Sequence, residues 1–195
     1  MHTRLKTTTL LLTVMLLATL AVAGTAQAQI ASSTKPNLVV TPQNAARFYG
    51  GANPEFIGIV NGLLKGDTIT VTYATVADAS SPVGDYLIIA TVTDPNNVLG
   101  KYNVTINTGT LSVAPAPLSI VAPDATRAAG QPNPSFVGTV TGVQNGEAIT
   151  ATFDSSATAG SPAGSYPIVP TLKDAAGTIA NYAVTTSNGK LIVTP

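Results

Sequence analysis

Beyond residue 28 the chain contains no histidine, cysteine, methionine or tryptophan, because its one histidine is His2 and its two methionines are Met1 and Met15. Nucleophilic catalysis by serine or cysteine usually needs a neighbouring base, most often histidine, and this part of the chain has none. Without cysteine, a domain outside the cell must be stable through packing alone. We therefore predict a protein that is not an enzyme, with no catalytic residue and no cofactor.

Charged residues are also few, at 9% of the sequence. The sequence has nine basic and nine acidic residues. Because Arg4 and Lys6 lie in the first 28 residues, the remainder carries seven basic and nine acidic side chains, a net charge of −2. Such a surface offers no basic patch for nucleic acid or for an anionic membrane. The many Thr, Val, Ala and Gly residues are instead typical of a β-rich extracellular module.

The first 28 residues have the three-part pattern of a secretory signal peptide. Arg4 and Lys6 precede an apolar run from Leu10 to Ala23, and Ala26-Gln27-Ala28 provides a cleavage site. The apolar run is shorter than the roughly 20 residues that a spanning helix needs, so cleavage is favoured over an uncleaved anchor. We expect a secreted protein at the cell surface, free outside the cell or in the periplasm, with no membrane insertion after cleavage and a loose lead-in at residues 29–36.

The rest of the sequence is one unit present twice. Leu38–Pro115 aligns with Leu118–Pro195 without a gap, and about 30 of the 78 positions are identical, so each residue of the first copy has a counterpart 80 positions later. A single period of this length indicates two tandem domains. We call residues 37–115 module one and residues 118–195 module two. Residues 116–117 are expected to be a linker, within the extended stretch Ala114-Pro115-Ala116-Pro117.

Each module shows short segments of alternating polarity and no helical period. Ile69, Val71 and Tyr73 alternate with threonines, and their counterparts Ile149, Ala151 and Phe153 are also apolar, which is the pattern of a half-buried strand. Further strands are predicted at 38–40, 56–60, 86–92, 102–106 and 111–113, the last two joined as a hairpin. Six or seven short strands per module predict an all-β chain of two antiparallel β-sandwiches.

Two prolines bear on the order of the strands. Pro167 and Pro170 fall in the strand that begins at Tyr166. Proline has no N–H to donate, and a central strand tolerates it badly. We therefore predict an edge strand or a bulge at this point of module two.

Several spaced motifs resemble the bacterial MBG domain of the YGX type: Tyr49-Gly50-Gly51-Ala52-Asn53-Pro54-Glu55-Phe56, Gly62, Gly66-Asp67, Ser81-Pro82-Val83-Gly84-Asp85-Tyr86, Tyr102 and Gly109-Thr110-Leu111-Ser112-Val113. The resemblance covers both modules. It implies a mostly-β extracellular module, usually found in tandem arrays within large surface or adhesin-like proteins, without an established enzymatic activity. Module two departs from the pattern, with Ala129 at the position of Tyr49 and Glu147 at that of Asp67.

A looser resemblance is to the D-x-G-x-Y-x-C corner of immunoglobulin domains, carried by Gly84, Tyr86 and Ile88, with isoleucine in place of cysteine. It implies that the two sandwiches are immunoglobulin-like in architecture.

Two segments carry residues of the types found in metal sites or in nucleophilic catalysis. Asp94-Pro95-Asn96-Asn97 offers oxygen ligands suited to Ca²⁺, but three neighbouring side chains fall short of the six to eight oxygens required, and module two keeps only Asp174. Ser187-Asn188-Gly189-Lys190 matches S-x-x-K, but it falls on the predicted hairpin turn. We interpret both segments as turns and predict no metal site.

Phe48 and Tyr49 form the one candidate contact site. The other aromatic residues after the leader occur in both modules at apolar positions and are interpreted as core, whereas Phe48-Tyr49 corresponds to Ala128-Ala129. Two interpretations compete. The pair either packs within module one, which is favoured, or forms an exposed contact that module one alone makes.

These features predict a secreted, non-enzymatic tandem β-module that serves as a stiff structural spacer or an adhesion element at a bacterial cell surface. The alternative is a specific binding module, whose candidate partners are a surface glycan or a surface protein. A third option is strand exchange into a filament through an edge of module one. No oligomeric state is predicted.

Overall fold

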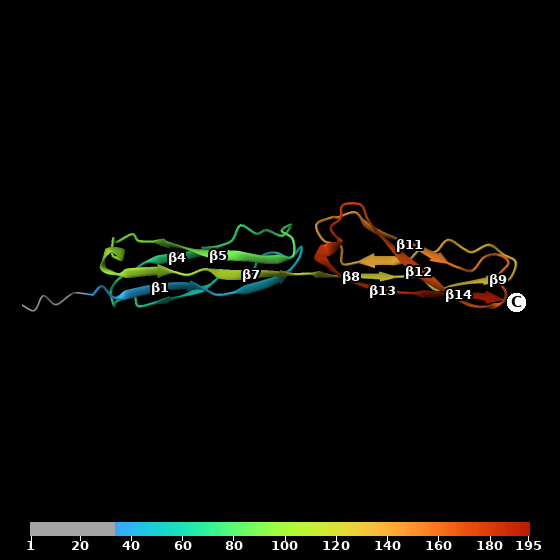
Figure 1. Cartoon of the computed structure of the whole chain (residues 1–195), viewed down its shortest axis with the longest axis horizontal. Coiled ribbons are helices and arrows are strands. Elements are labelled where there is room, and N and C mark those ends of the chain that lie inside the picture. Colours follow the sequence, from blue (N-terminus) through green and yellow to red (C-terminus); the bar gives the residue numbers. More distant parts are fainter. Residues whose placement is uncertain (1–33) are drawn as a thin grey trace, which may run out of the picture. The chain divides into compact units, whose positions relative to one another are not determined.

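The computed structural model describes residues 34–195, and in each module a three-stranded and a four-stranded sheet form the two layers of a sandwich (Figure 1). The all-β fold expected from the alternating segments is confirmed. The predicted signal peptide and residues 29–33 of the lead-in lie outside the described residues. Within residues 34–195, no helix has the length and hydropathy needed to cross a membrane.

Module one has seven strands and a short 3-10 helix: β1 (Asn37–Pro42), β2 (Ala45–Phe48), β3 (Gly58–Asn61), β4 (Thr70–Ala74), β5 (Gly84–Thr93), η1 (Leu99–Lys101), β6 (Asn103–Ile106) and β7 (Gly109–Ala114). The sheets have the orders β3-β1-β6 and β2-β7-β5-β4. β1 and β2 are consecutive in the chain but lie in different sheets, where they pair in parallel with β6 and β7.

Module two repeats this topology: β8 (Ala116–Val121), β9 (Ala125–Ala128), β10 (Thr139–Thr141), β11 (Ile149–Ser155), β12 (Gly164–Asp174), η2 (Ile179–Asn181), β13 (Tyr182–Ser187) and β14 (Gly189–Thr194). Its sheets have the orders β10-β8-β13 and β11-β12-β14-β9. Ala116 and Pro117 pair with Tyr182 and Ala183, so they begin β8 and only Pro115 lies between the last strand of one module and the first of the next.

The period-two pattern explains which side chains form the core. In β4, Val71 and Tyr73 point inward and are partly buried, while Thr70 and Thr72 are exposed. The most completely buried side chains include three pairs of counterparts: Leu38 and Leu118, Ile88 and Ile168, and Leu111 and Leu191. The repeat in the sequence is therefore a repeat of core positions.

The predicted hairpin around Asn107-Thr108-Gly109 is wrong. β6 pairs with β1 in one sheet, whereas β7 pairs with β2 and β5 in the other. The short link therefore crosses from one layer of the sandwich to the other. A short glycine-containing connection between two apolar segments is common to both arrangements, so the local sequence did not distinguish them.

The edge strand or bulge predicted from Pro167 and Pro170 is also wrong, because β12 lies between β11 and β14 and both of its ladders run in unbroken register. The pairing is staggered along β12: residues 164–168 pair with β14, and residues 168–174 pair with β11. Pro167 is opposite Lys190 and Pro170 is opposite Phe153, so each proline has a neighbouring strand on one side only. A missing N–H costs a ladder hydrogen bond only on a paired side, which is how an inner strand accommodates both prolines.

Candidate functional site

A buried arginine holds the turn that carries Tyr49. From β2, Arg47 donates Nε to Asn53 Oδ1 at 2.7 Å, Nη1 to the carbonyl of Phe48 at 3.1 Å, and Nη2 to the carbonyl of Asp78. The amide of Asn53 donates to the carbonyl of Ala77 at 2.6 Å. These bonds tie β2 to the two loops beside it, so the Tyr49 turn is fixed by side chains beneath it.

Module two has the same support but presents a different side chain. Arg127 Nε donates to Asn133 Oδ1 at 2.7 Å, and the residue at the tip of the turn is Ala129. Gly50 and Gly130 follow the tip with φ of 78° and 82°, a left-handed conformation that favours glycine. The two turns therefore have one backbone form, and only the one in module one carries an aromatic ring.

Tyr49 contacts module two. Its side chain is 4% exposed, its hydroxyl donates to Glu147 Oε1, and its ring stands edge-on to the ring of Tyr182 with the centroids 5.5 Å apart and an interplanar angle of 80°. The Tyr182 hydroxyl donates to Glu147 Oε2 at 2.7 Å. One carboxylate thus accepts a hydroxyl from each module, and we call this contact the joint.

Close packing surrounds the joint. A Cβ on Gly50 would lie 2.4 Å from Cβ of Gln144 in module two, whereas a Cβ on the counterpart Gly130 would meet nothing within 4 Å. The backbone N–H of Val83 donates to Asn181 Oδ1 at 3.0 Å, across the same boundary. Gly50 is therefore needed both for its φ and for the space its missing side chain leaves.

The apolar core runs through the joint. One continuous cluster of buried residues joins five residues of module one to four of β8 and module two: Tyr49, Ala77, Ile88, Leu111 and Val113, with Ala116, Leu118, Ile149 and Tyr182. The corresponding inner cluster of module two, which includes Ile168 and Leu191, stays separate, as does the cluster of Leu38 and Tyr102 in module one. Burial shared between the modules favours their docking.

The joint shifts the pKa values of its three ionisable groups. Burial alone would raise the pKa of the Glu147 carboxyl, but hydrogen bonds from Tyr49 and Tyr182 outweigh it and hold that pKa below the ordinary value of 4.5. Burial, and then the bond to Glu147, raise the pKa of Tyr182 from 10.0 to about 12. The bond to Glu147, and then burial, raise the pKa of Tyr49. The joint therefore favours a charged glutamate between two neutral phenols.

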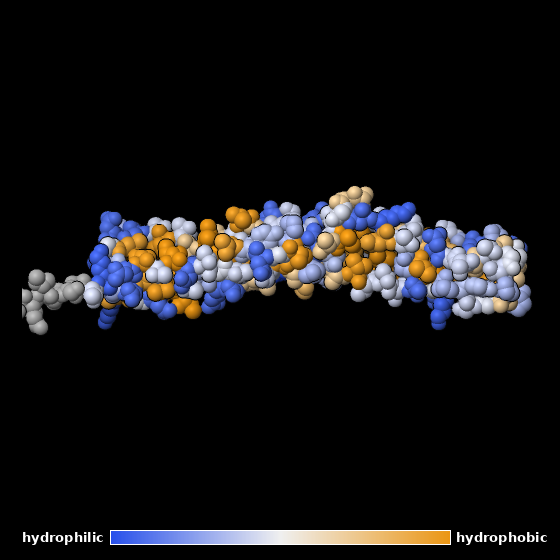
Figure 2. Space-filling view, viewed as in Figure 1, coloured by the Kyte–Doolittle hydropathy of each residue, from blue (hydrophilic) through white to orange (hydrophobic). Residues whose placement is uncertain are grey.

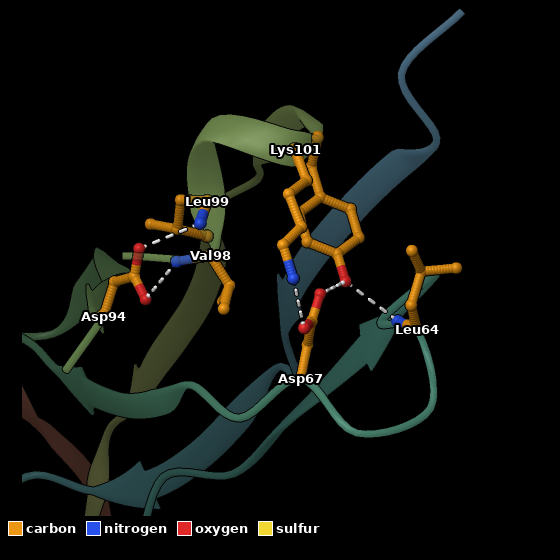
Figure 3. Close-up of polar contacts among 7 residues, drawn as sticks. Leu64, Asp67, Asp94, Val98, Leu99 and Lys101 are labelled. Atoms are coloured by element: carbon orange, nitrogen blue, oxygen red, sulfur yellow. Dashed lines mark hydrogen bonds and ion pairs between the residues drawn. The ribbon is translucent and has the colours of Figure 1, made fainter. Parts of the chain in front are cut away.

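Module one has the counterpart of this carboxylate, with a different second partner (Figure 3). Asp67 Oδ2 accepts the Tyr102 hydroxyl at 2.5 Å, and Oδ1 accepts Lys101 Nζ at 2.7 Å. The backbone N–H of Leu64 donates to the Tyr102 oxygen at 3.0 Å, as that of Gln144 does to Tyr182 at 2.9 Å. Lys101, and then Tyr102, hold the pKa of Asp67 below its ordinary range.

The structure separates the two candidate contact residues. Tyr49 is buried, but against module two and not within module one alone, whereas Phe48 is 60% exposed. Sequence reasoning did not identify Glu147, Tyr182 or Asn181 as partners. The Tyr49/Ala129, Asp67/Glu147 and Lys101/Asn181 pairs differ between the modules, but so do about 48 of the 78 aligned positions, so these differences alone did not identify the contact.

The segments considered for metal or nucleophile chemistry have structural partners. Asp94 accepts the backbone N–H groups of Val98 at 2.9 Å and Leu99 at 2.8 Å, one on each oxygen, at the start of η1 (Figure 3). Ser187 ends β13 and Lys190 lies in β14. Among residues 34–195, no three acidic, histidine or cysteine side chains gather closely enough to hold a metal ion.

The sequence was compared with models of known protein families. The model of the MBG domain (YGX type) matches residues 38–112 and again residues 118–192, which together are more than half of the chain. Each match spans the turn after β2 or β9, the carboxylate and the tyrosine of one module. A comparison with curated proteins finds no match.

The stability of the joint should fall both at low pH and at high pH. Glu147, with a lowered pKa, stabilises the docked form above about pH 4.5, and this contribution is lost as the pH falls below that value. Tyr182, with a raised pKa, stabilises it below pH 10.0, and this contribution is lost between there and about pH 12. Ultraviolet titration of the six tyrosines should show a last step that Tyr182→Phe removes and Glu147→Gln moves to lower pH. A single common step near the ordinary value would contradict this assignment.

Proposed function

Since the chain belongs to the MBG domain (YGX type) family, a family of non-catalytic β-modules, we propose that it is a secreted structural spacer, which holds two β-sandwiches in one fixed arrangement at a bacterial cell surface. Secretion is supported by the leader pattern of residues 1–28.

The observation that carries the proposal is the joint. A pair of domains connected only by Pro115 would be expected to move independently unless their interface were large and apolar. Here a shared core cluster, an edge-on pair of rings and a shared carboxylate lie at the boundary. A spacer needs a fixed separation between its ends, and these contacts favour a single arrangement of the two modules.

The chemistry of the contact suits the outside of a cell. The modules contain no thiol that oxidation could change, and Glu147 is charged throughout the range in which most extracellular media lie. The joint therefore keeps its partners without a disulfide. In this proposal the chain works mechanically, by setting the distance and direction between what is attached to its two ends.

Two matched substitutions test whether the joint fixes the arrangement. Gly50→Ala and Gly130→Ala impose the same left-handed backbone on alanine, at a cost of about 1–2 kcal/mol each, but only the first places a Cβ against Gln144. Gly50→Ala should broaden the distribution of distances between spin labels placed on the two modules, and Gly130→Ala should leave this distribution narrow. The chain has no native cysteine, so introduced cysteines take the labels specifically.

Tyr49→Phe provides the graded case, because it removes the hydroxyl and keeps the ring. Tyr49→Phe should broaden the distribution of distances between the spin labels less than Gly50→Ala does. Equally narrow distributions in all variants, or a broad one in the unaltered protein, would contradict a spacer that depends on this joint.

A second candidate function is specific binding of a glycan or a protein, and it is favoured by exposed apolar side chains. Of the sixteen large hydrophobic residues exposed in the described chain, eleven lie in module one, and Figure 2 shows hydrophobic residues, in orange, at the visible surface. Phe48, Leu87 and Ile89 lie on the outer face of its four-stranded sheet, where module two has Ala128, Pro167 and Val169. Exposed aromatic and aliphatic side chains on one face of a sheet are suited to a sugar or protein surface.

Phe48→Ala tests this second candidate. If the outer face binds a ligand, the unaltered protein should retain defined glycans on an array or a defined protein in a pull-down. Phe48→Ala should lose most of that binding while its thermal unfolding stays unchanged, because Phe48 is largely exposed. Val76→Ala, at an exposed position outside the strands, serves as the control and should bind normally. Binding that survives Phe48→Ala would exclude this face.

A further inference from the structure

Module one carries a second copy of the docking site that Tyr49 fills in module two. In module two the site consists of Glu147 and Tyr182, with Gln144 beside them, and the counterparts in module one are Asp67, Tyr102 and Leu64. The hydrogen bonds of the two sites match. Each tyrosine hydroxyl donates to the carboxylate of its own module and accepts a backbone N–H, from Leu64 in module one and from Gln144 in module two. The two sites are therefore built alike.

The two sites differ in the group that donates to one of the two carboxylate oxygens. In module two, Glu147 Oε1 accepts the hydroxyl of Tyr49 from the neighbouring module. In module one, the corresponding Oδ1 of Asp67 accepts Lys101 Nζ at 2.7 Å, from the same module. The counterpart of Lys101 is Asn181, whose Oδ1 accepts the N–H of Val83 across the joint and which makes no ion pair with Glu147.

We propose that Lys101 closes, from within module one, a docking site that would otherwise accept the Tyr-Gly turn of another YGX module. The pair of modules then has one working joint and one closed site of the same design. This inference depends on the geometry of the joint and stands whether or not the protein is a spacer.

Charge explains why the lysine excludes a docking partner. The Lys101 side chain is 56% exposed while Asp67 is 11% exposed, so the ammonium is solvated and the carboxylate is already covered. An incoming phenol ring placed as Tyr49 is placed would have to displace the ammonium or bury it, and burying a charge without full pairing is costly. An exposed ion pair contributes little to folding stability, so the effect of Lys101 is on access to Asp67.

The turn after β9 in module two lacks the side chain that a joint needs. The Arg127 support and the left-handed Gly130 are present, but the tip is Ala129, which has neither a ring nor a hydroxyl. Gly130 also has open space around it, where Gly50 packs against Gln144. Within residues 34–195, the Asp67 site and the Ala129 turn thus both lack a feature that the joint uses, which disfavours head-to-tail association of two such pairs through these surfaces.

The test is a chain in which residues 36–115 occur twice in succession, which keeps the period of 80 residues and creates one new boundary. At that boundary the Tyr49 turn of the first copy meets the Asp67 site of the second copy. The second copy is made in two forms. One carries Leu64→Gln, Lys65→Asn and Asp67→Glu with Lys101 kept, and the other carries the same three changes with Lys101→Asn. Spin labels across the new boundary report docking, and the original joint in the same chain is the reference for correct folding.

With Lys101 kept, the new boundary should give a broad distribution of distances. With Lys101→Asn it should narrow to the width of the original joint. A distribution as narrow with Lys101 as without it would overturn the proposal. So would a boundary that stays broad after Lys101→Asn while the original joint remains narrow.

Discussion

The arrangement of the two modules depends on one carboxylate that accepts hydroxyls from both. Each oxygen of Glu147 accepts a phenol hydroxyl, one from Tyr49 and one from Tyr182, whose rings are in edge-on contact with each other. Glu147 is partly buried, and a hydrogen bond to an ionised carboxylate is stronger than one between neutral groups, so both phenol donors stabilise it. Undocking would remove one donor and expose the apolar cluster at the same time, so the polar and apolar contributions favour the same docked state.

The rest of each sandwich serves to bring the two halves of this contact into place. The crossing of the chain between layers after β1 puts β2 beside β7, and the Arg47 network then fixes the turn that follows. At the other end of the module, the turn after β3 and the 3-10 helix bring the carboxylate and the tyrosine together. Because both ends are present in each module, the fold can form a joint wherever the right side chains meet. The identity of a few side chains, and not a change of fold, then decides whether it does.

Much of the fold followed from the sequence, and the limits have physical causes. The alternation around Val71 and Tyr73 located strands, and the 80-residue repeat located the modules, since both depend on local pattern. The link at Asn107 and the prolines of β12 were misread, because pairing partners and stagger depend on distant strands. Phe48 and Tyr49 were singled out as the aromatic difference between the modules, but the surroundings of Tyr49 depend on Glu147 and Tyr182, which are 98 and 133 residues away in the chain (147 − 49 and 182 − 49).

The most direct measurement of the central claim is a double-mutant cycle between Tyr49→Phe and Glu147→Gln, with unfolding free energy as the readout. Groups that share a hydrogen-bond network are coupled by about 0.5–3 kcal/mol, and we expect a coupling of this size. The parallel cycle of Tyr49→Phe with Asp67→Asn should show additivity to within about 0.5 kcal/mol, because Asp67 bonds to Lys101 and Tyr102 instead. Additive effects of Tyr49→Phe and Glu147→Gln would show that the two side chains do not hold the modules together.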